Sequence, residues 1–317
     1  MENMQSPQVS VIVPAFKIAP YIAEAIDGVV GQTFTDWEVI VINDGSPDTV
    51  ELEQALAPYL DKIVYIKQEN KGAGAARNAG MKVARGEYVA FLDGDDIWLP
   101  NFLSSQLELI QSDGGYDLVY ADAENFGDPE TEGHTSMETN PSEGEVTFTS
   151  LIASKTCVIT SGVLVRRQCL IDVGYMDDSF PNSQDFDLWL RLARDAHARI
   201  TYQRTVLVRR RLYPTSLAGD AVKSLRGELA VLNKTLKRPD LTQSEKELIE
   251  EIIQFRQAMV DQTLGKRSLL KGEYRAATES FVAANRVLRS WKLSLVLMGM
   301  RVAPGLVQRA SRSRSAN

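Results

Sequence analysis

Residues 1–215 alternate between short apolar runs and segments in which apolar residues recur with helical spacing. Runs of about four to eight apolar residues predict buried strands, and recurrence about every three or four positions predicts amphipathic helices. The expected strands are 9–13, 37–42, 63–66, 88–92, 116–121, 160–165 and 200–208. The expected helices include 21–30, 50–60, one that opens within 70–74 and runs through 83, and one that begins near 184. Repeated strand–helix–strand units at this spacing favour the α/β class with a mostly parallel central sheet.

The pattern changes near residue 220, after which we expect helices without strands. Residues 225–236 and 245–264 have helical spacing, and residues 291–308 mix apolar residues with cations. A chain of 317 residues is long enough to bury a large core and to carry an extension. The sequence therefore predicts an α/β domain over 1–219, a helical C-terminal extension over 220–309 and a disordered Ser- and Arg-rich tail over 310–317.

Asp93, Asp95 and Asp96 crowd their carboxylates directly after the expected strand 88–92. Crowded carboxylates repel one another and lose hydration, and a bound divalent cation would offset that cost. Oxygen ligands suit Mg²⁺ or Mn²⁺, and Mg²⁺ is usually held by one or two carboxylates together with substrate phosphates. The alternative interpretation is a solvated acidic turn in which Gly94 supplies a positive φ.

Two other expected strands also end in polar or loop residues. Pro14, Ala15 and Phe16 follow the first strand, and Asp44 follows the second. The carboxyl ends of parallel strands lie at one edge of a sheet, and ligands of such sheets bind outside that edge. We therefore expect these residues and the acidic cluster to face one crevice, which a chance acidic turn does not predict.

The composition disfavours several other functions. The net charge of −7 argues against general nucleic-acid binding. Cys157 and Cys169 provide neither a disulfide framework nor a zinc spacing, and His134 and His197 leave little for a His-based triad. Residues 1–8 lack an apolar signal region, and no run approaches the ~20 apolar residues that span a bilayer. We expect a cytoplasmic protein with reduced thiols.

Five short motifs follow one another within residues 1–215. They are VSVIVPAF at 9–16, NDGS at 43–46, NxG with ARN between 70 and 78, GEYVAFLDGDD at 86–96, and QDFDLWLRL at 184–192. In their order and spacing they resemble the family 2 glycosyltransferases of GT-A fold. The resemblance implies an inverting, metal-dependent transferase over residues 1–219. It would move a sugar from a nucleotide-diphosphate donor, most often a UDP-sugar, to a hydroxyl of a glycan or lipid-linked acceptor in polysaccharide or cell-surface glycan synthesis.

The resemblance also implies which residues bind the donor nucleotide. The set comprises Pro14, Ala15, Phe16, Asp44, Arg77, Asp93 and Gly94. Within it, Asp44 would accept a hydrogen bond from the uracil ring, and Asp93 would face the ribose. Without the resemblance, Asp44 is interpreted as a turn-forming residue and Arg77 as a surface residue of a helix.

By the same resemblance, Asp95 would bind Mn²⁺ or Mg²⁺ on the diphosphate, and Asp185 would be the general base. Without it, Asp185 is interpreted as a helix N-cap. Arg209 and Arg211 are candidates for phosphate contacts, and a solvated basic face is the alternative for this basic segment.

The sequence departs from the family pattern at three positions. Gln184 precedes Asp185 where Glu is usual, and Asn43 precedes Asp44 where a second Asp is common. Tyr213 stands where a His is often found after the last core strand. The resemblance therefore supplies no histidine contact to the metal or the diphosphate at that position.

Two other functions compete with the transferase. A nucleotide-sugar-binding protein without catalysis would not need to retain Asp93, Asp95 and Asp185 together. A sugar nucleotidyltransferase would need a Gly-rich basic loop after the first strand, and residues 14–17 contain no glycine.

The C-terminal segment is basic. No acidic residue follows Glu279, whereas seven cations do: Arg286, Arg289, Lys292, Arg301, Arg309, Arg312 and Arg314. One interpretation of residues 291–308 is peripheral membrane contact, with an interfacial helix on the inner face of the cytoplasmic membrane near a lipid-linked acceptor. The other is a helix packed on the catalytic domain or on a dimer partner.

Overall fold

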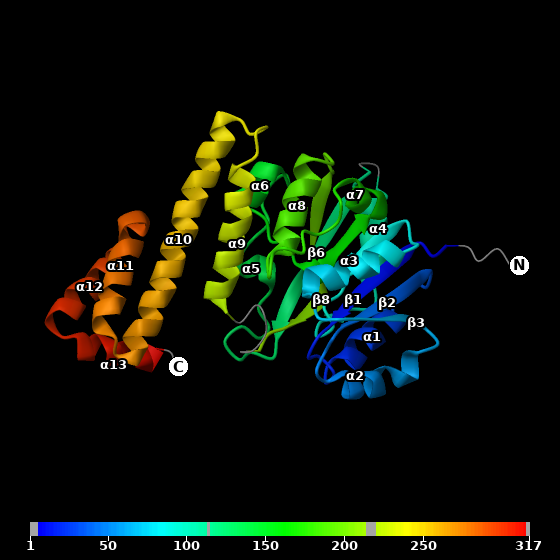
Figure 1. Ribbon diagram of the computed structural model, residues 1–317, viewed down its shortest axis with the longest axis horizontal. Helices are drawn as coiled ribbons and strands as arrows, with labels where there is room; N and C mark the ends of the chain where they lie inside the picture. Colours follow the sequence, from blue (N-terminus) through cyan, green and yellow to red (C-terminus); the bar gives the residue numbers. More distant parts are fainter. Residues whose placement is uncertain (1–5, 113–114, 214–219, 315–317) are drawn as a thin grey trace, which may run out of the picture. The chain divides into compact units, whose positions relative to one another are not determined.

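The computed structural model describes residues 6–112, 115–213 and 220–314 (Figure 1). The chain divides into two compact units, Met1–Pro214 and Thr215–Asn317. In the described residues, the first unit holds all the strands and the second holds only helices.

A single mixed sheet organises the first unit. Among the described residues its order is β3-β2-β1-β4-β7-β6-β8-β5. The strands are β1 Val9–Ala15, β2 Trp37–Asp44, β3 Ile63–Gln68, β4 Tyr88–Phe91, β5 Ile97–Trp98, β6 Leu118–Phe126, β7 Val163–Arg166 and β8 Ile200–Arg211. β7 runs antiparallel to β4 and β6, and β5 runs antiparallel to β8. The remaining pairs are parallel, so the predicted mostly parallel sheet is confirmed.

Helices cover both faces of this sheet (Figure 1). They are α1 Ile22–Val30, α2 Thr49–Leu56, α3 Ala73–Val83, α4 Phe102–Ile110, α5 Ser136–Thr139, α6 Phe148–Ile152, α7 Arg167–Asp172 and α8 Gln184–Arg194, with short 3₁₀ turns η1 Ala57–Tyr59 and η2 Thr160–Gly162. The apolar sides of α1, α2 and α4 join one buried cluster with alternate residues of β1, β2 and β4. α3 and α8 pack on the other face, where Trp189 of α8 meets Phe91 with ring centroids 6.3 Å apart.

Gly80 allows α3 to lie close to the sheet. A Cβ atom at this position would lie 2.7 Å from Cγ2 of Ile12 and 2.9 Å from Cδ1 of Ile42. A larger residue would push the helix off the sheet. This close contact holds α3 against β1 and β2.

The first strand is longer than predicted, because it continues through Pro14 to Ala15. Pairing between β1 and β4 ends at Ile12 and Phe91, and Leu92 N–H donates to Ile12 O at 3.0 Å. A backbone N–H at position 14 would point toward β4, beyond the last hydrogen bond between β1 and β4. Proline is therefore tolerated inside a central strand at this position.

Two further differences have local causes. The strand expected to end at residue 121 continues as β6 to Phe126, and α5 follows it, with an N-cap Thr135 that forms a capping box with Glu138. The strand expected over 160–165 begins as the η2 turn, and only Val163–Arg166 pairs as β7.

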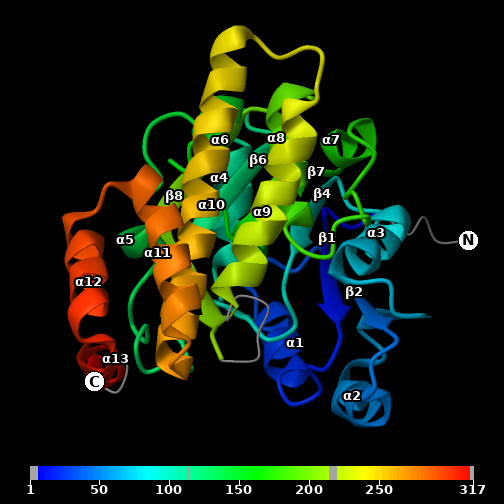
Figure 2. The ribbon, with the colours of Figure 1, turned by 60° about the vertical axis from the view of Figure 1, so that its left-hand side comes forward.

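The second unit contains α9 Ala221–Leu236, α10 Gln243–Lys271, α11 Tyr274–Leu288, α12 Trp291–Val302 and α13 Pro304–Arg314 (Figure 2). α9 and α10 share a small buried cluster, and α10 to α13 share another centred on Phe281. Helix α13 extends into the segment that the sequence predicts to be disordered, and residues 315–317 lie outside the described part. Within the described chain, every helix is too short or too polar to cross a bilayer.

Candidate active site

The loops after β1 and β2 are joined at the carboxyl edge of the sheet. Lys17, which has a φ of 58°, donates its backbone N–H to Ser46 Oγ at 2.7 Å. Asp48 accepts from Ala19 N at 3.0 Å. Ala15 is fully buried in this arrangement, whereas Phe16 is 41% exposed. Phe16 therefore offers an accessible aromatic ring beside the strand ends, where the sequence predicts nucleotide contact.

Asp44, at the end of β2, is buried and anchors the segment that leads into α3. Its Oδ1 accepts from Gln68 Nε2 at 2.7 Å and from Lys71 N at 2.9 Å, and its Oδ2 accepts from Gly72 N at 2.8 Å. A carboxylate offers about four acceptor positions, so these bonds leave room for a further donor on Oδ2. The turn-forming interpretation and the predicted nucleobase contact are compatible here, and the nucleobase contact stays a prediction.

The carboxylates after β4 have three different environments. Asp93 forms an ion pair with Arg77. Asp95 accepts a hydrogen bond from the Tyr213 hydroxyl at 2.9 Å. Asp96 is buried and accepts from Ser161 Oγ at 2.6 Å and from Arg211 N at 2.9 Å. Asp96 therefore supports the loop, and Asp93 and Asp95 are the partly exposed members.

The pKa values of Asp95 and Asp96 are both raised, first by burial and then by the neighbouring carboxylates. Burial, and then the charge of Asp93, raise the pKa of Asp95. Burial, together with Asp93 and Asp95, raises the pKa of Asp96 well above the usual range for Asp. Because neighbouring carboxylates add to the effect of burial on both pKa values, a cation would be stabilised at this position.

The donor chemistry fits a hard divalent cation that shares its ligands with a substrate. In the part of the chain that the structure describes, no three His, Cys, Asp or Glu side chains gather to hold a metal by themselves. Asp95 offers carboxylate oxygen at the sheet edge, and Mg²⁺ typically takes one or two carboxylates plus phosphate oxygens. A cation at Asp95 would thus depend on a bound diphosphate.

Arg77 brings the predicted residues together. It lies on α3, and its side chain is only 9% exposed, which rules out the surface interpretation. Burial disfavours its charge, but attraction to Asp93, Asp185 and Asp95 outweighs this and raises the pKa of Arg77. One buried guanidinium therefore lies among the predicted ribose, metal and base carboxylates.

The Nε of Arg77 is a buried donor for which the described residues provide no hydrogen-bond acceptor. A buried unsatisfied donor costs about 1–3 kcal/mol, so such groups in native proteins usually have a reason. A ligand oxygen would satisfy it, and a phosphate is the kind of acceptor that a guanidinium favours.

Asp185 occupies the first turn of α8. The N-cap is Ser183, whose φ is 62°, so the N-cap interpretation of Asp185 is wrong. The Asp185 Oδ2 accepts from the Thr160 hydroxyl at 2.8 Å, and Oδ1 accepts from Phe186 N at 2.8 Å. Gln184 packs against α3, since a Cβ at Gly74 would lie 2.9 Å from its Cγ. This packing joins the helices that carry Arg77 and Asp185.

Two adjacent residues of η2 connect the carboxylates, and no sequence pattern singles them out. Thr160 holds Asp185, and Ser161 Oγ donates to Asp96 while it accepts from Asp93 N at 3.1 Å. The Ser161 carbonyl also accepts from Trp98 Nε1 at 2.7 Å. The only sequence signal is a polar Thr-Ser-Gly at the start of an otherwise apolar strand, which is too common to identify a site.

Given the general-base role that the resemblance implies for Asp185, replacing Thr160 with Val should lower kcat for the implied transfer by about tenfold with little change in KM, because the carboxylate loses the hydrogen bond that orients it. Steady-state kinetics and thermal unfolding of the variant test this. Thr160→Ser keeps the hydroxyl and should retain most of the activity. Equal losses in both variants would show that Thr160 acts through packing alone.

Gly94 is a glycine because of packing, not because of its backbone angle. It is absent from the positive-φ residues of the described chain, so the alternative of an acidic turn with a left-handed Gly94 is wrong in that respect. A Cβ at Gly94 would lie 2.1 Å from Cδ1 of Ile18 and 3.0 Å from Cδ1 of Ile22. The acidic loop therefore lies directly on the start of α1.

Gly94→Ala is expected to lower the free energy of unfolding by about 1–3 kcal/mol, because the added methyl overlaps Ile18. Denaturant unfolding measures the loss. The double variant Gly94→Ala with Ile18→Val removes the overlapping Cδ1 and should recover part of the stability. No recovery in the double variant would contradict the packing argument.

Arg209 and Arg211 both contact Phe126, with guanidinium carbons 4.5 and 4.4 Å from the ring centroid. Arg211 also lies 4.5 Å from the ring of Tyr21, pairs with Glu24 at 2.9 Å and donates from Nε to the Asp95 carbonyl at 3.0 Å. These contacts give Arg211 a role in holding the acidic loop. Phosphate contact by either arginine stays a prediction.

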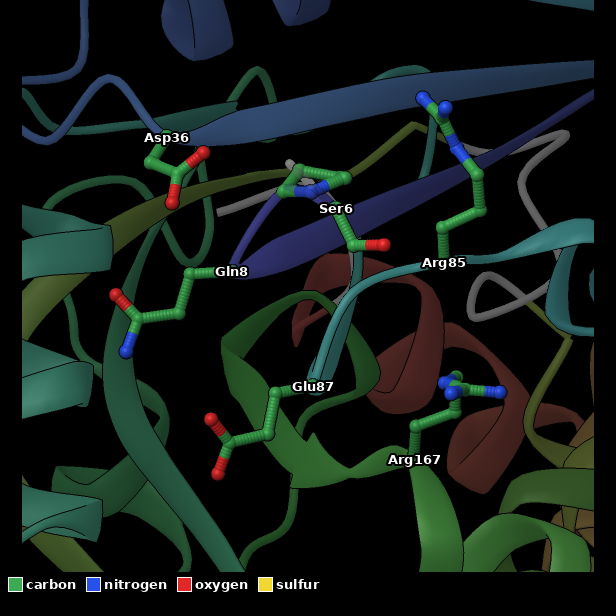
Figure 3. Close-up of a pocket in the computed structure, with 7 residues that line it drawn as sticks. Ser6, Gln8, Asp36, Arg85, Glu87 and Arg167 are labelled. Atoms are coloured by element: carbon green, nitrogen blue, oxygen red, sulfur yellow. The ribbon is translucent and has the colours of Figure 1, made fainter. Parts of the chain in front are cut away.

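A separate cavity of about 580 Å³ lies at the opposite edge of the sheet, where β1 and β4 begin (Figure 3). Its lining residues are Ser6, Pro7, Gln8, Asp36, Arg85, Glu87 and Arg167. Arg85 pairs with Glu38 at 2.8 Å, and Arg167 Nε donates to the Gly86 carbonyl at 2.8 Å. Since both cations have protein partners and ligands of such sheets bind at the carboxyl edge, this cavity is not the candidate active site.

Comparison with known proteins decides the family. Residues 10–174 match the family model described as Glycosyl transferase family 2. The chain belongs to this family. A glycosyltransferase of Rickettsia typhi is 31% identical over 257 residues, which cover 78% of this chain and 77% of the relative. Three further relatives are glycosyltransferases of Rickettsia felis, R. bellii and R. conorii, and the chain spans only 30–35% of their length.

Solved structures of other proteins share the fold of this chain. TarS 1–349 of Staphylococcus aureus, solved with UDP-GlcNAc, is 20% identical with a TM-score of 0.63, over 98% of this chain and 91% of that one. The mannosyltransferase PcManGT of Pyrobaculum calidifontis, solved with GDP-Man and Mn²⁺, is 15% identical with a TM-score of 0.62, over 98% and 85%. The predicted GT-A fold is confirmed.

Proposed function

We propose that this family 2 glycosyltransferase moves a sugar from a nucleoside-diphosphate sugar, with a UDP-sugar as the leading candidate, to a hydroxyl of a glycan or lipid-linked acceptor. The catalytic domain would comprise residues 1–219. The observation that carries the proposal is the buried Arg77 among Asp93, Asp95 and Asp185. Structural relatives solved with UDP-GlcNAc or with GDP-Man support a nucleotide-sugar donor.

The donor would lie along the carboxyl edge of β1, β2 and β4. Pro14 and Phe16 would line the nucleotide pocket, whereas the predicted lining residue Ala15 is buried in the core and would only support them. The remaining acceptor position of Asp44 would take a uracil N–H. The Arg77 Nε, which lacks an acceptor within the described chain, would donate to the donor. Asp93 would face the ribose, and its ion pair with Arg77 would fix its position.

Asp95 would hold a Mn²⁺ or Mg²⁺ ion together with the diphosphate. When bound, the ion neutralises charge on the departing nucleoside diphosphate. PcManGT was solved with Mn²⁺, which supports this choice of cofactor. Tyr213 would orient Asp95 from the position at which the family often has His.

Asp185 would act as the general base. As the acceptor oxygen forms its bond to the anomeric carbon, the bond from that carbon to the phosphate oxygen breaks, and the hydroxyl proton passes to the Asp185 carboxylate. Thr160 would hold the carboxylate in position for this transfer. Attack from the face opposite the leaving group makes one displacement and inverts the anomeric configuration.

A donor panel tests the proposal. Purified protein is incubated with UDP-, GDP- and dTDP-sugars, with Mn²⁺, Mg²⁺ or a chelator, and released nucleoside diphosphate is measured. We expect turnover of one donor class, with UDP-sugars first, that depends on the metal. Binding of a nucleotide sugar without turnover under any condition would favour the alternative of an inactive binding protein. Release of pyrophosphate from a nucleoside triphosphate and a sugar phosphate would favour a nucleotidyltransferase.

A further inference from the structure

Helix α12 has apolar side chains on two opposite faces. Leu293 and Met300 are buried in the cluster that contains Phe281. On the other side, four apolar residues are exposed: Trp291 by 68%, Leu295 by 51%, Met298 by 55% and Val302 by 87%. Their spacing of i, i+4, i+7 and i+11 places them along a single line on the helix surface. We call these four residues the α12 stripe.

Cations flank the stripe on both sides. At 100° per residue, Lys292 and Arg301 lie on opposite flanks of the line that runs from Trp291 to Val302. Both are exposed, as are Arg286, Arg289 and Arg309 nearby in the sequence. No acidic residue occurs in the sequence after Glu279. The surface of α12 therefore combines an apolar line with positive charge only.

The neighbouring helices leave this face open. Within the second unit, α11 lies between α10 and α12, so the buried side of α12 faces α11 (Figure 2). Leu306 of α13 is 63% exposed and adds one more apolar side chain next in sequence. Exposure of several apolar side chains in one line is unfavourable in water unless another surface covers them.

We propose that the α12 stripe docks on an anionic lipid surface. Trp291, Leu295, Met298 and Val302 would enter the boundary between headgroups and acyl chains, where the exposed apolar face of an interfacial helix lies. Lys292 and Arg301 would extend their apolar stems beside the stripe and place their charges among anionic headgroups.

The flanking cations favour an anionic lipid surface over a second copy of this chain. A second copy of α12 would bring its own flanking cations against the first set, and like charges repel. An acidic protein groove is the remaining candidate. The inference goes beyond the proposed sugar transfer, because the surface lies in the helical unit and uses none of the catalytic residues.

Vesicle co-sedimentation of the full chain tests the proposal. We expect binding to phosphatidylglycerol-containing vesicles, weak binding to pure phosphatidylcholine vesicles, and loss of binding at high ionic strength. The triple variant Trp291→Ser, Leu295→Ser, Val302→Ser should lower the partition coefficient by about tenfold or more. Reversal of charge in Lys292→Glu with Arg301→Glu should lower it by a similar factor on anionic vesicles.

A matched control separates the stripe from general surface hydrophobicity. Val50 and Leu60, 65% and 57% exposed in the first unit, are replaced together by Ser, which should leave vesicle binding unchanged. Absence of binding to anionic vesicles, or equal binding by the triple variant, would overturn the proposal. A second result would also overturn it: the natural protein binds no vesicles and forms dimers in sedimentation velocity, and the triple variant is monomeric. The stripe would then join two copies of the chain.

Discussion

Replacing Asp185 with Asn is expected to lower kcat for sugar transfer by about a hundredfold to ten-thousandfold, the range that a general base contributes. Asn has the size of Asp, and its amide can still exchange hydrogen bonds with Thr160 and with Phe186 N. The Asn side chain cannot take the proton from the hydroxyl of the sugar acceptor. The nucleotide dissociation constant should change by less than about twofold, because the proposed donor contacts come from β1, β2, β4 and α3.

The comparison uses initial rates for the variant and calorimetry with the nucleoside diphosphate. Asp172→Asn is a suitable control, since this carboxylate is exposed on α7 and accepts a hydrogen bond from Gln168 Nε2 at 2.7 Å, on the same helix. It should keep full activity. Unchanged turnover in Asp185→Asn would remove Asp185 from the mechanism, whereas parallel losses in both variants would indicate a general effect on folding.

Replacing Asp95 with Asn is expected to abolish the effect of Mn²⁺ on donor binding. With Mn²⁺ present, the dissociation constant of the nucleoside diphosphate should rise by roughly a hundredfold or more, because the cation loses its carboxylate ligand. Without Mn²⁺, the variant and the natural protein should bind the nucleotide about equally. Calorimetric titrations with and without a chelator measure both quantities.

Tyr213→Phe is the matched variant for Asp95. It keeps the carboxylate and the ring that lies 5.7 Å from the ring of Tyr21, but it removes the hydroxyl that donates to Asp95. We expect a smaller loss of about tenfold in Mn²⁺-dependent affinity, which is typical of a group that orients a metal ligand. An Asp95→Asn variant that still responds to Mn²⁺ like the natural protein would show that the cation binds elsewhere.

The edge of the sheet that carries the site is predictable from the sequence because local patterns determine it. The apolar runs locate β1, β2 and β4, and parallel strands place their carboxyl ends together. These two facts are enough to place Asp44 and the acidic cluster at one edge. The antiparallel direction of β7 and the two-residue β5 are not predictable, because direction depends on pairing with distant strands and β5 is too short for a periodic signal.

Burial and pairing inside the site cannot be predicted from the local sequence. Nothing in the ARN motif shows that Arg77 is buried, and nothing in the acidic cluster shows that Asp96 turns inward to Ser161 while Asp95 faces Tyr213. These outcomes depend on η2, which lies far after the cluster in sequence, as the 65-residue separation of Asp96 and Ser161 shows. Long-range contacts of this kind leave no periodic pattern.

The three carboxylates have different environments, and this explains how the fold tolerates their mutual repulsion. Arg77 pairs with Asp93, and burial together with the neighbouring carboxylates raises the pKa of Asp96, so both effects weaken the repulsion within the cluster. Asp95 carries the remaining charge at the edge of the sheet, close to the point where a diphosphate would be held. This arrangement fits a site that stays folded when empty and gains a cation together with its substrate.

The most direct test of the central claim is a crystal structure of the protein with UDP and Mn²⁺, in which anomalous scattering locates the ion. The account predicts an anomalous peak about 2.1 Å from a carboxylate oxygen of Asp95, with the diphosphate beside Arg77 and Asp185 facing the same space. A nucleotide in the cavity lined by Arg85 and Arg167, or an ion distant from Asp95, would contradict it.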